Sequence, residues 1–485
     1  MKRLFTLLSL LLTLAVCHIQ ALAQPVWTSV DDTTRTERER ITQTDYEVSL
    51  CTRGRTWKPL EVRGALVSNI VRRTSNETDS LGTERTLMGF CMFTDDFRRP
   101  VKVRVRRRGA PFDMVQIRPT DARIPYKRID GQTIEFTLRS ARQRVSVEYD
   151  GDRNHNLFLI PDLPCQQPSD SSRVIYYGPG EHEVGNIDLQ SGQTLYLAEG
   201  AIVYATLTAH HASDIAVRGR GILCGSRAAH DFSRRPCLVN FQSCCRVTLE
   251  GVMFRGSPSW TLNLGNCDSV LIDNVKQICW MRNSDGIDLC NVRHARIRNC
   301  FLRNYDDNIS LKNYNVGVPD AHLYDIRMED CLLWADAAHN LLVGPESRPD
   351  LEMSDIAFSR IHILEGRETA YPWVGALAVM ISDEGAFRDV VFQDIVLDDI
   401  RGGRLFSVDY CRYNTKGRQA SNIQLKNIRY TGMTPPESMI WGLDTDHQVE
   451  GITLQNVQIN GVRLTPTNLS EYVSVNPFVR GLVVE

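Results

Sequence analysis

Three aspartates within residues 283–313 have the residue type and the spacing of an acid–base site. Asp285 lies in the sequence NSDGIDL, and Asp306 and Asp307 follow in NYDDNISLKN. The apolar residues between these two acidic turns alternate as in a half-buried strand, at Val292, Ala295, Ile297, Cys300 and Leu302. Two turns that are about one coil of stacked strands apart would bring the three carboxyl groups together on one face.

A phrase of the form apolar-x-apolar-x-anchor-apolar recurs along the C-terminal two-thirds of the chain. The anchors lie 23 to 34 residues apart, at Gly219, Gly251, Asn274, Asn299, Asp330, Arg360, Asp394, Asn427 and Asn456. Such a period is typical of solenoids and propellers. A propeller blade needs about 40 residues and four strands, which the shortest spacings cannot supply. The repeat therefore predicts a right-handed parallel β-helix over residues 171–485.

The N-terminal third of the chain has a different character. Residues 24–170 contain short alternating segments such as VKVRVRRR, TIEFTL and RVSVEYDG between Gly, Pro and Asp turns, which is the pattern of an antiparallel β-sandwich. The stretch LIPDLPCQQPSDSS reads as a linker. We therefore predict an all-β protein with a sandwich domain ahead of the β-helix.

Residues 1–23 have the features of a signal peptide, with Lys2 and Arg3, an apolar run, and Ala21-Leu22-Ala23 before the cleavage site. Lipoprotein anchoring through Cys17 is a lesser alternative, because Val16 is a poor residue for the preceding position. No later stretch reaches the roughly 18 apolar residues of a membrane span. We expect a secreted or periplasmic protein.

Charge and cysteine usage exclude several classes of partner. The net charge of −2 becomes −4 without the two cations of the signal segment, so no polyanion is attracted as a whole. The basic stripe of Lys102, Arg104, Arg106 and Arg108 alternates with valines and is interpreted as a solvated sheet face rather than a nucleic-acid site. The sequence has no Cys-x-x-Cys pair. We expect no metal and no cofactor.

Four tracts, GSPSWTLNLGN, NSDGIDL, NYDDNISLKN and AAHNLLVG, follow in order the motifs NSPxW, NTDG, DDCIAIKSG and GHGxSxG. By these residues the chain resembles the β-helical glycoside hydrolases of the polygalacturonase family (family 28) and their dextranase and isopullulanase relatives (family 49). The resemblance covers about residues 174–460. A sandwich followed by SGQTLYLAEGA is similar to the layout of the second group, whereas His339 favours the first.

The resemblance implies that Asp306 is the general acid and that Asp285 and Asp307 bind and activate a water molecule. Hydrolysis with inversion needs a protonated carboxyl and a carboxylate about 6.5 to 9.5 Å apart, and repulsion within a carboxyl cluster raises the pKa of one member. Neighbouring strand residues point to opposite faces, so the chain must bend at residues 305–308. Asp288 is expected to brace the turn of Asp285.

The resemblance also suggests substrate-binding residues. His339 matches the site histidine of the family, and Lys312 matches the lysine of its DDCIAIKSG motif. Trp260 falls one coil before Asp285, where its ring could stack on a sugar. Asn283 opens the first acidic turn. We expect these four residues to contact a polysaccharide or oligosaccharide.

The residues in the later strand VGALAVMISDEG bear on the charge of the substrate. Polygalacturonases grip the substrate carboxylate with an Arg-x-Lys on a later coil, whereas this strand carries Val379 and Met380. Asp383 and Glu384 follow and would repel a uronate. These residues predict a neutral, dextranase-like substrate. A pectin hydrolase remains the alternative, with a loop cation from Arg348 or Arg404.

Two further classes stay open on the sequence alone: a β-helical polysaccharide lyase and a non-catalytic carbohydrate-binding solenoid. The sequence does not determine the sugar, the linkage, endo or exo action, or the oligomeric state. Glycosylation sequons occur at Asn76, Asn308 and Asn468. A glycan on Asn308 would lie inside the proposed site, which favours a bacterial origin.

Overall fold

The computed structural model describes residues 45–52, 56–68, 85–168, 172–228, 236–313, 321–367, 375–410, 417–433 and 437–485. The predicted signal peptide, Cys17 and the sequon at Asn76 lie outside these residues. Within them the chain is built almost entirely of strands, with two short 3₁₀ helices, η1 (Thr120–Ala122) and η2 (Leu469–Glu471).

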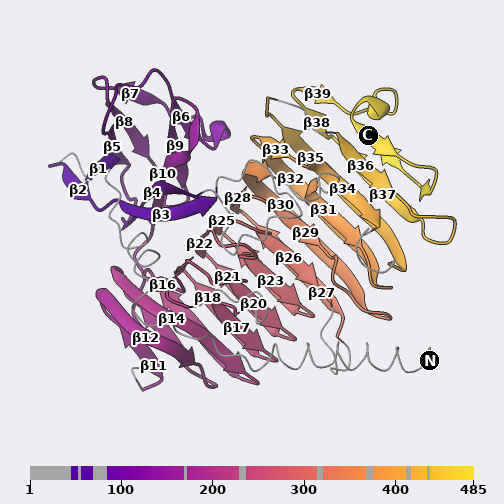
Figure 1. Cartoon of the computed structure of the whole chain (residues 1–485), viewed down its shortest axis with the longest axis horizontal. Coiled ribbons are helices and arrows are strands. Elements are labelled where there is room, and N and C mark those ends of the chain that lie inside the picture. Colours follow the sequence, from indigo (N-terminus) through magenta and orange to yellow (C-terminus); the bar gives the residue numbers. More distant parts are fainter. Residues whose placement is uncertain are drawn as a thin grey trace.

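The N-terminal strands form two five-stranded sheets (Figure 1). The outer sheet has the order β2-β1-β5-β8-β7 and consists of β1 (Tyr46–Cys51), β2 (Lys58–Leu60), β5 (Val101–Arg107), β7 (Tyr126–Arg128) and β8 (Thr133–Leu138). The inner sheet has the order β3-β4-β10-β9-β6 and consists of β3 (Arg63–Ser68), β4 (Arg85–Thr94), β6 (Val115–Arg118), β9 (Val145–Tyr149) and β10 (Asp152–Asp162). All pairs are antiparallel except β4 with β10, which is parallel. The predicted sandwich is confirmed, with this one parallel pair added.

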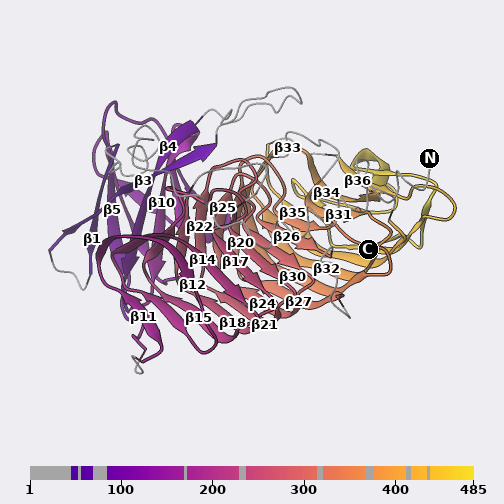
Figure 2. The ribbon, with the colours of Figure 1, turned by 60° about the horizontal axis from the view of Figure 1, so that its bottom comes forward.

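The remaining strands wind into a parallel β-helix with three sheets, stacked from β11 at one end towards β37 at the other (Figures 1 and 2). The first sheet contains β11 (Val174–Tyr177), β13 (Thr194–Leu197), β15 (Ser213–Gly219), β18 (Cys245–Glu250), β21 (Asp268–Asp273), β24 (Arg293–Arg298), β27 (Leu323–Glu329), β30 (Glu352–Arg367), β32 (Ala386–Leu397), β35 (Gln419–Tyr430) and β37 (Val449–Gln455).

The second sheet contains β16 (Ile222–Cys224), β19 (Met253–Arg255), β22 (Lys276–Cys279), β25 (Phe301–Asn304), β28 (Leu332–Ala335), β33 (Ile400–Gly402) and the later halves of β30, β32 and β35. The third sheet contains β17 (Val239–Gln242), β20 (Leu262–Gly265), β23 (Ile287–Cys290), β26 (Ile309–Lys312), β29 (Leu341–Val343), β31 (Gly375–Ile381), β34 (Arg404–Tyr410), β36 (Ser438–Trp441) and β40 (Val473–Val475). The other strands lie at the two ends of the helix: β12 (Gly180–Asp188), β14 (Ala201–His210), β38 (Gln458–Ile459), β39 (Val462–Arg463), β41 (Val479–Arg480) and β42 (Val483–Val484).

The repeat anchors turn the chain from the first sheet into the second. Their backbone is left-handed, with φ of 59° at Asn274, 55° at Asn299 and 53° at Asn427. Glycine, asparagine and aspartate adopt this conformation at the lowest cost. Arg360, with φ of 51°, occupies the same place without that advantage. The prediction of a right-handed parallel β-helix is confirmed, and the anchors explain its period.

Apolar side chains fill the interior of the helix along its whole length. Cys300 and Cys331 are buried and stack in consecutive coils, where the backbone N–H of Cys300 lies 3.4 Å from Cys331 Sγ. These two cysteines are not joined in a disulfide. The interpretation of the cysteines at this position as small packing residues is therefore confirmed.

Candidate active site

Four site residues stand in one column at the start of the third sheet. Ile287 of β23 pairs with Ile309 of β26, so Asp285 and Asp307 occupy equivalent places two residues earlier. The same register places Trp260 one coil before Asp285 and His339 one coil after Asp307. Neighbouring coils are about 4.8 Å apart, so each member lies within reach of the next.

The chain bends where the two adjacent aspartates lie. Strand β25 ends at Asn304 and β26 begins at Ile309, with Asp306 and Asp307 in the bend between them. Asp307 is buried, whereas Asp306 is the more exposed of the pair. The predicted bend at residues 305–308 is confirmed, and it releases the two side chains from the strand alternation.

Buried amides hold the acidic turns in place. Asn304 Nδ2 donates to Gln277 Oε1 and to Asn308 Oδ1, both at 2.9 Å. Asn308 Nδ2 donates to Asn340 Oδ1 at 2.9 Å, and Gln277 Nε2 donates to the Gly286 carbonyl at 3.0 Å. The amides thus connect three coils beneath the site. Apart from the residue types, no feature of the sequence predicted these hydrogen bonds.

Asp307 is paired with His339. The His339 backbone N–H donates to Asp307 Oδ1 at 3.1 Å, and the ring Nδ1 lies 2.5 Å from the same oxygen. Burial by itself would raise the pKa of Asp307, but the charge and hydrogen bonds of His339, with help from Lys312, hold this pKa below its ordinary value. Asp307 therefore remains a carboxylate in acidic solution.

Asp285 has the opposite environment. Burial and the nearby carboxylate of Asp288 raise the pKa of Asp285 well above its ordinary value, and Lys312 only partly opposes them. Burial likewise raises the pKa of Asp288 to about 7 against the effect of Lys312. The Lys312 ammonium lies 3.4 Å from Asp285 Oδ2, 2.8 Å from Asp288 Oδ1 and 3.1 Å from Glu346 Oε2. Lys312 is thus the cation that holds this carboxyl cluster together, and Glu346 is a member that sequence reasoning missed.

Trp260 and Asn283 frame the first acidic turn. The Trp260 side chain is buried, and the Lys312 ammonium lies 3.6 Å from the centroid of its ring. This contact covers one face of the ring. Asn283 has a left-handed backbone with φ of 59°, and its carbonyl accepts a hydrogen bond from Ser259 Oγ at 3.4 Å. Both residues adjoin the carboxyl cluster, and their contacts with a substrate stay a prediction.

Asp383 and Glu384 lie away from the aspartate column. They follow β31, whereas the column precedes the third-sheet strands, so the length of a strand separates the two groups. Asp383 Oδ2 accepts hydrogen bonds from the Ser347 N–H at 3.3 Å and from Ser382 Oγ at 3.1 Å. The structure does not bring these two acids together with Asp285 and Asp307.

The later coils show which side chains continue the column. Leu341 of β29 pairs with Leu377 of β31, so Gly375 follows His339, while Val379 lies in the core. A Cβ on Gly375 would come within 2.6 Å of the Phe406 and Ser407 backbone, so this position admits no side chain. Gly375 then pairs with Arg404. Arg404 stands two coils beyond His339, paired with Glu437 at 3.0 Å.

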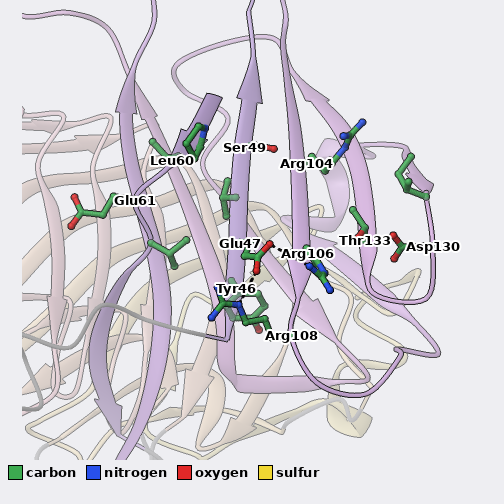
Figure 3. Close-up of a pocket in the computed structure, with 14 residues that line it drawn as sticks. Tyr46, Glu47, Ser49, Leu60, Glu61, Arg104, Arg106, Arg108, Asp130 and Thr133 are labelled. Atoms are coloured by element: carbon green, nitrogen blue, oxygen red, sulfur yellow. Dashed lines mark hydrogen bonds and ion pairs between the residues drawn. The ribbon is translucent and has the colours of Figure 1, made fainter. Parts of the chain in front are cut away.

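A second concavity of about 630 Å³ lies on the outer sheet of the sandwich (Figure 3). Its arginines are paired with carboxylates: Arg104 with Glu135 at 2.9 Å, and Arg108 with Glu47 at 2.9 Å. The basic side chains alternate with buried valines along β5, as predicted. Neutralised arginines on an open sheet face agree with its interpretation as a solvated surface.

Among the described residues, no group of three or more His, Cys, Asp or Glu side chains could hold a metal ion. In the same part of the chain no helix is long and apolar enough to cross a membrane. The column itself carries the carboxyl groups of Asp285 and Asp307, and the more exposed Asp306 lies beside Asp307 in the bend.

Comparison with known proteins places the chain among carbohydrate-active enzymes. The family model described as Glycosyl hydrolases family 28 matches residues 223–476, slightly more than half of the chain. A protein named Probable polygalacturonase from Arabidopsis thaliana is 23% identical over 219 residues, which cover 43% of this chain and 44% of that relative. The chain therefore spans less than half the length of that relative.

A solved structure of similar fold and a second, weaker match were found. Dex49A from Penicillium minioluteum superposes with a TM-score of 0.61 at 14% identity, covering 92% of this chain and 94% of that one. A hyperthermoactive exopolygalacturonase from Thermotoga maritima gives a TM-score of 0.45 at 17% identity, covering 64% and 83%. The first of these shares both the sandwich and the β-helix region, because the match covers nearly the whole of each chain.

Proposed function

The chain belongs to family 28 of the glycosyl hydrolases, and from this premise we propose that it is an inverting hydrolase of a neutral, dextranase-like polysaccharide or oligosaccharide. The observation that carries the proposal is the pair of aspartates in one column with opposite shifts in pKa, beside the more exposed Asp306. An inverting hydrolase needs a carboxylate that accepts a proton from water, which fits Asp307, and a proton donor that can reach the leaving group, which fits the more exposed Asp306.

In the proposed mechanism Asp306 donates its proton to the leaving glycosidic oxygen. Water held between Asp285 and Asp307 attacks the anomeric carbon from the opposite face and loses a proton to Asp307. The lowered pKa of Asp307 suits it to be the base. Asp285 retains its proton and orients the water through a hydrogen bond. One displacement with no covalent intermediate inverts the anomeric centre.

Stereochemistry tests this mechanism directly. Proton NMR of the first-formed product should show the anomer opposite to that of the substrate. Retention, or capture of a glycosyl-enzyme, would mean that one aspartate acts as a nucleophile and would overturn the proposal.

The role of Asp306 is tested by Asp306→Asn, which removes the proton donor with little change in shape. Turnover should fall by about 10² to 10⁴, the usual size of general-acid assistance. Circular dichroism and thermal unfolding should match the wild type. Unchanged turnover on a confirmed substrate would remove Asp306 from the mechanism.

The neutral substrate is supported by the column itself. Beyond His339 it continues as the bare Gly375, and the next member, Arg404, is paired with Glu437. Of the described residues in contact with the carboxyl cluster, the cation is Lys312, which is already paired with Asp285, Asp288 and Glu346. A uronate there would lack a counter-charge, and an unpaired buried charge costs several kcal/mol. We therefore expect a neutral glycan to be cleaved in preference to polygalacturonate.

A pectin hydrolase is the alternative, favoured by the similarity to a probable polygalacturonase and by the place of Arg404 in the column. The values of kcat/KM on de-esterified polygalacturonate and on a panel of neutral α-glucans should be compared at matched low salt, where repulsion is least screened. Faster cleavage of polygalacturonate would reverse the assignment. Arg404→Gln and Arg348→Gln would then identify the residue that binds the carboxylate.

The proposal extends to the domain organisation and the location of the protein. We assign residues 1–23 as a signal peptide, 24–170 as the sandwich domain and 171–485 as the catalytic domain, with a secreted or periplasmic location. A polysaccharide lyase would release unsaturated products that absorb in the ultraviolet, and a binding solenoid would keep its affinity after replacement of the aspartates. Either result would replace the hydrolase assignment.

A further inference from the structure

The sandwich and the β-helix share one apolar interface. It joins the inner sheet to the second sheet through Ala65, Val67, Met88, Phe90, Phe158 and Ile160 on one side and Tyr204, Ile278, Phe301, Leu332, Trp334 and Leu364 on the other. Figure 1 shows the sandwich beside β22, β25 and β28, the strands that lead into the acidic turns.

A fully buried arginine crosses this interface. Arg303 of β25 forms an ion pair with Asp336, at 3.2 Å between Nη2 and Oδ1. Its Nη1 donates to Asn156 Oδ1 of the sandwich at 3.0 Å and lies 3.3 Å from Met88 Sδ. Its guanidinium stacks over Trp334, 4.2 Å from the ring centroid, and Trp334 Nε1 donates to Asp336 Oδ1 at 2.9 Å.

The Arg303–Asp336 ion pair lies within the β-helix with its side chains 0–2% exposed, and burying an ion pair at a domain interface costs free energy. Apolar residues of similar volume at such a site are often equally or more stabilising, and other buried ion pairs, such as Arg118 with Asp398 at 3.2 Å, already link the two domains directly. We therefore expect Arg303 to have a role other than stabilising the domain interface. Its place in the chain suggests one.

The ion pair fixes the starting points of two turns. Arg303 lies three residues before Asp306, and Asp336 lies three residues before His339. The backbone N–H of Asp336 donates to the Asn304 carbonyl at 2.9 Å. Between the two turns, Tyr305 packs against Ala337. This hydrogen bond and this packing thus hold the two turns together where they leave the interface. The turns end at Asp307 and His339, which contact each other.

We propose that Arg303 is a positioning residue for the Asp307–His339 pair and that the sandwich, through Asn156, is a working part of the catalytic centre rather than an independent module. Asn156 is held in turn by Ser146, since Asn156 Nδ2 donates to Ser146 Oγ at 2.7 Å. The sandwich thereby fixes the guanidinium, and the guanidinium fixes both turns. The kinetic part of this inference rests on the proposed hydrolase function.

The test variant is Asn156→Leu, which removes the acceptor with little change in volume. Loss of the acceptor should loosen Arg303 and let the two turns shift. Displacement of a catalytic group by about 1 Å can cost about 100-fold in rate, so we expect kcat to fall between about 10-fold and 100-fold with KM nearly unchanged. Asn156→Asp keeps the acceptor for Arg303 but loses the donor to Ser146, so its turnover should lie between those of Asn156→Leu and the wild type.

Titration of His339 gives a measurement that does not depend on activity. The charged groups around the pair are Lys312 at the end of β26, Asp306 beside Asp307, and Asp285 and Asp288 from the preceding coil. In the full chain labelled with ¹⁵N-histidine, the His339 ring should titrate at lower pH in Asn156→Leu than in the wild type, because it has moved away from the carboxylate. In Asn156→Asp, which keeps only the acceptor for Arg303, the titration should lie between those of Asn156→Leu and the wild type.

A matched control exists at the same interface. Arg220 forms an ion pair with Asp162 of the sandwich at 3.0 Å, with both side chains 9% exposed, and it precedes β16 near the start of the helix. Arg220→Met should lower the melting temperature while leaving kcat, KM and the His339 titration unchanged. A merely adhesive role for Arg303 would make the two sites behave alike.

Two results would overturn the inference. Asn156→Leu could lower only the melting temperature, with kcat, KM and the His339 titration as in the wild type. Arg220→Met could reproduce the kinetic and titration changes of Asn156→Leu. If the wild type cleaves no glycan, the proposed function fails by itself, and the titration in the free protein then decides the positioning role alone.

Discussion

The two acidic turns occupy equivalent places in adjacent coils, yet the pKa values of their aspartates are shifted in opposite directions. Asp285 faces Trp260 in the preceding coil and Asp288 in its own strand, and its pKa is raised. Asp307 faces His339 in the following coil, and its pKa is lowered. Both are buried. The repeat thus supplies the position, while the surroundings set the direction of the pKa shift: burial and Asp288 for Asp285, and His339 for Asp307.

The largest effect that separates the two turns should come from Asp307→Asn. An amide cannot accept the proton of the attacking water, so turnover should fall by about 10² to 10⁴. The measurement is kcat on a confirmed substrate, with near-ultraviolet circular dichroism to verify the fold. A variant with more than a tenth of the wild-type turnover would show that Asp307 is not the base.

Asp285→Asn should lower turnover less than Asp307→Asn does. If Asp285 already carries a proton, the amide replaces one hydrogen-bonding group with another. Disturbance of a neutral hydrogen bond worth about 1 to 1.5 kcal/mol corresponds to about a tenfold loss of kcat. Equal losses in Asp285→Asn and Asp307→Asn would contradict the difference between the turns and mean that both act as carboxylates.

His339→Ala should change the pH dependence more than the maximum rate. His339 lowers the pKa of Asp307, so its removal raises that pKa and protonates the base at a higher pH. The acidic limb of kcat/KM should therefore move to higher pH, and activity should be lost earlier on acidification. An unmoved acidic limb would show that another group titrates there. His294→Ala, on the exposed face of the first sheet, is the matched control.

Among these variants, Lys312→Met should have the smallest effect on the difference between Asp285 and Asp307. Lys312 lowers the pKa of both Asp285 and Asp307, so its loss shifts both in the same direction. The acidic limb should move to higher pH by less than in His339→Ala, and the difference between the two aspartate variants should persist in the Lys312→Met background. Disappearance of that difference would identify Lys312, rather than His339, as its source.

Much of this arrangement could be predicted from the sequence, because short-range rules govern it. The anchors Asn274, Asn299 and Asn427 turn the chain through left-handed conformations that their residue types favour. The bend at Asp306 and Asp307 follows from the need to place two adjacent side chains in one site. These features depend on a few consecutive residues.

Other features depend on register between coils, which the sequence encodes weakly. The contact of Glu346 with Lys312 joins a loop to a strand end, and no local pattern announces it. Asp383 and Glu384 are close in sequence to β31, whose first residue continues the column. They follow the last residue of β31, however, and therefore lie at the opposite end of the strand from the column. Arg303 appears in the sequence as an ordinary strand cation, and only the docked sandwich shows that it is buried.

Asn308 begins an Asn-Ile-Ser tripeptide, yet its side chain is fully buried between Asn304 and Asn340. A eukaryotic oligosaccharyltransferase acts on the unfolded chain as it enters the secretory pathway, before the coils close. A glycan attached there could not be accommodated, and the coil that carries the catalytic turn could not form. Secretion from yeast or animal cells should therefore yield inactive or retained protein, whereas bacterial production avoids the conflict.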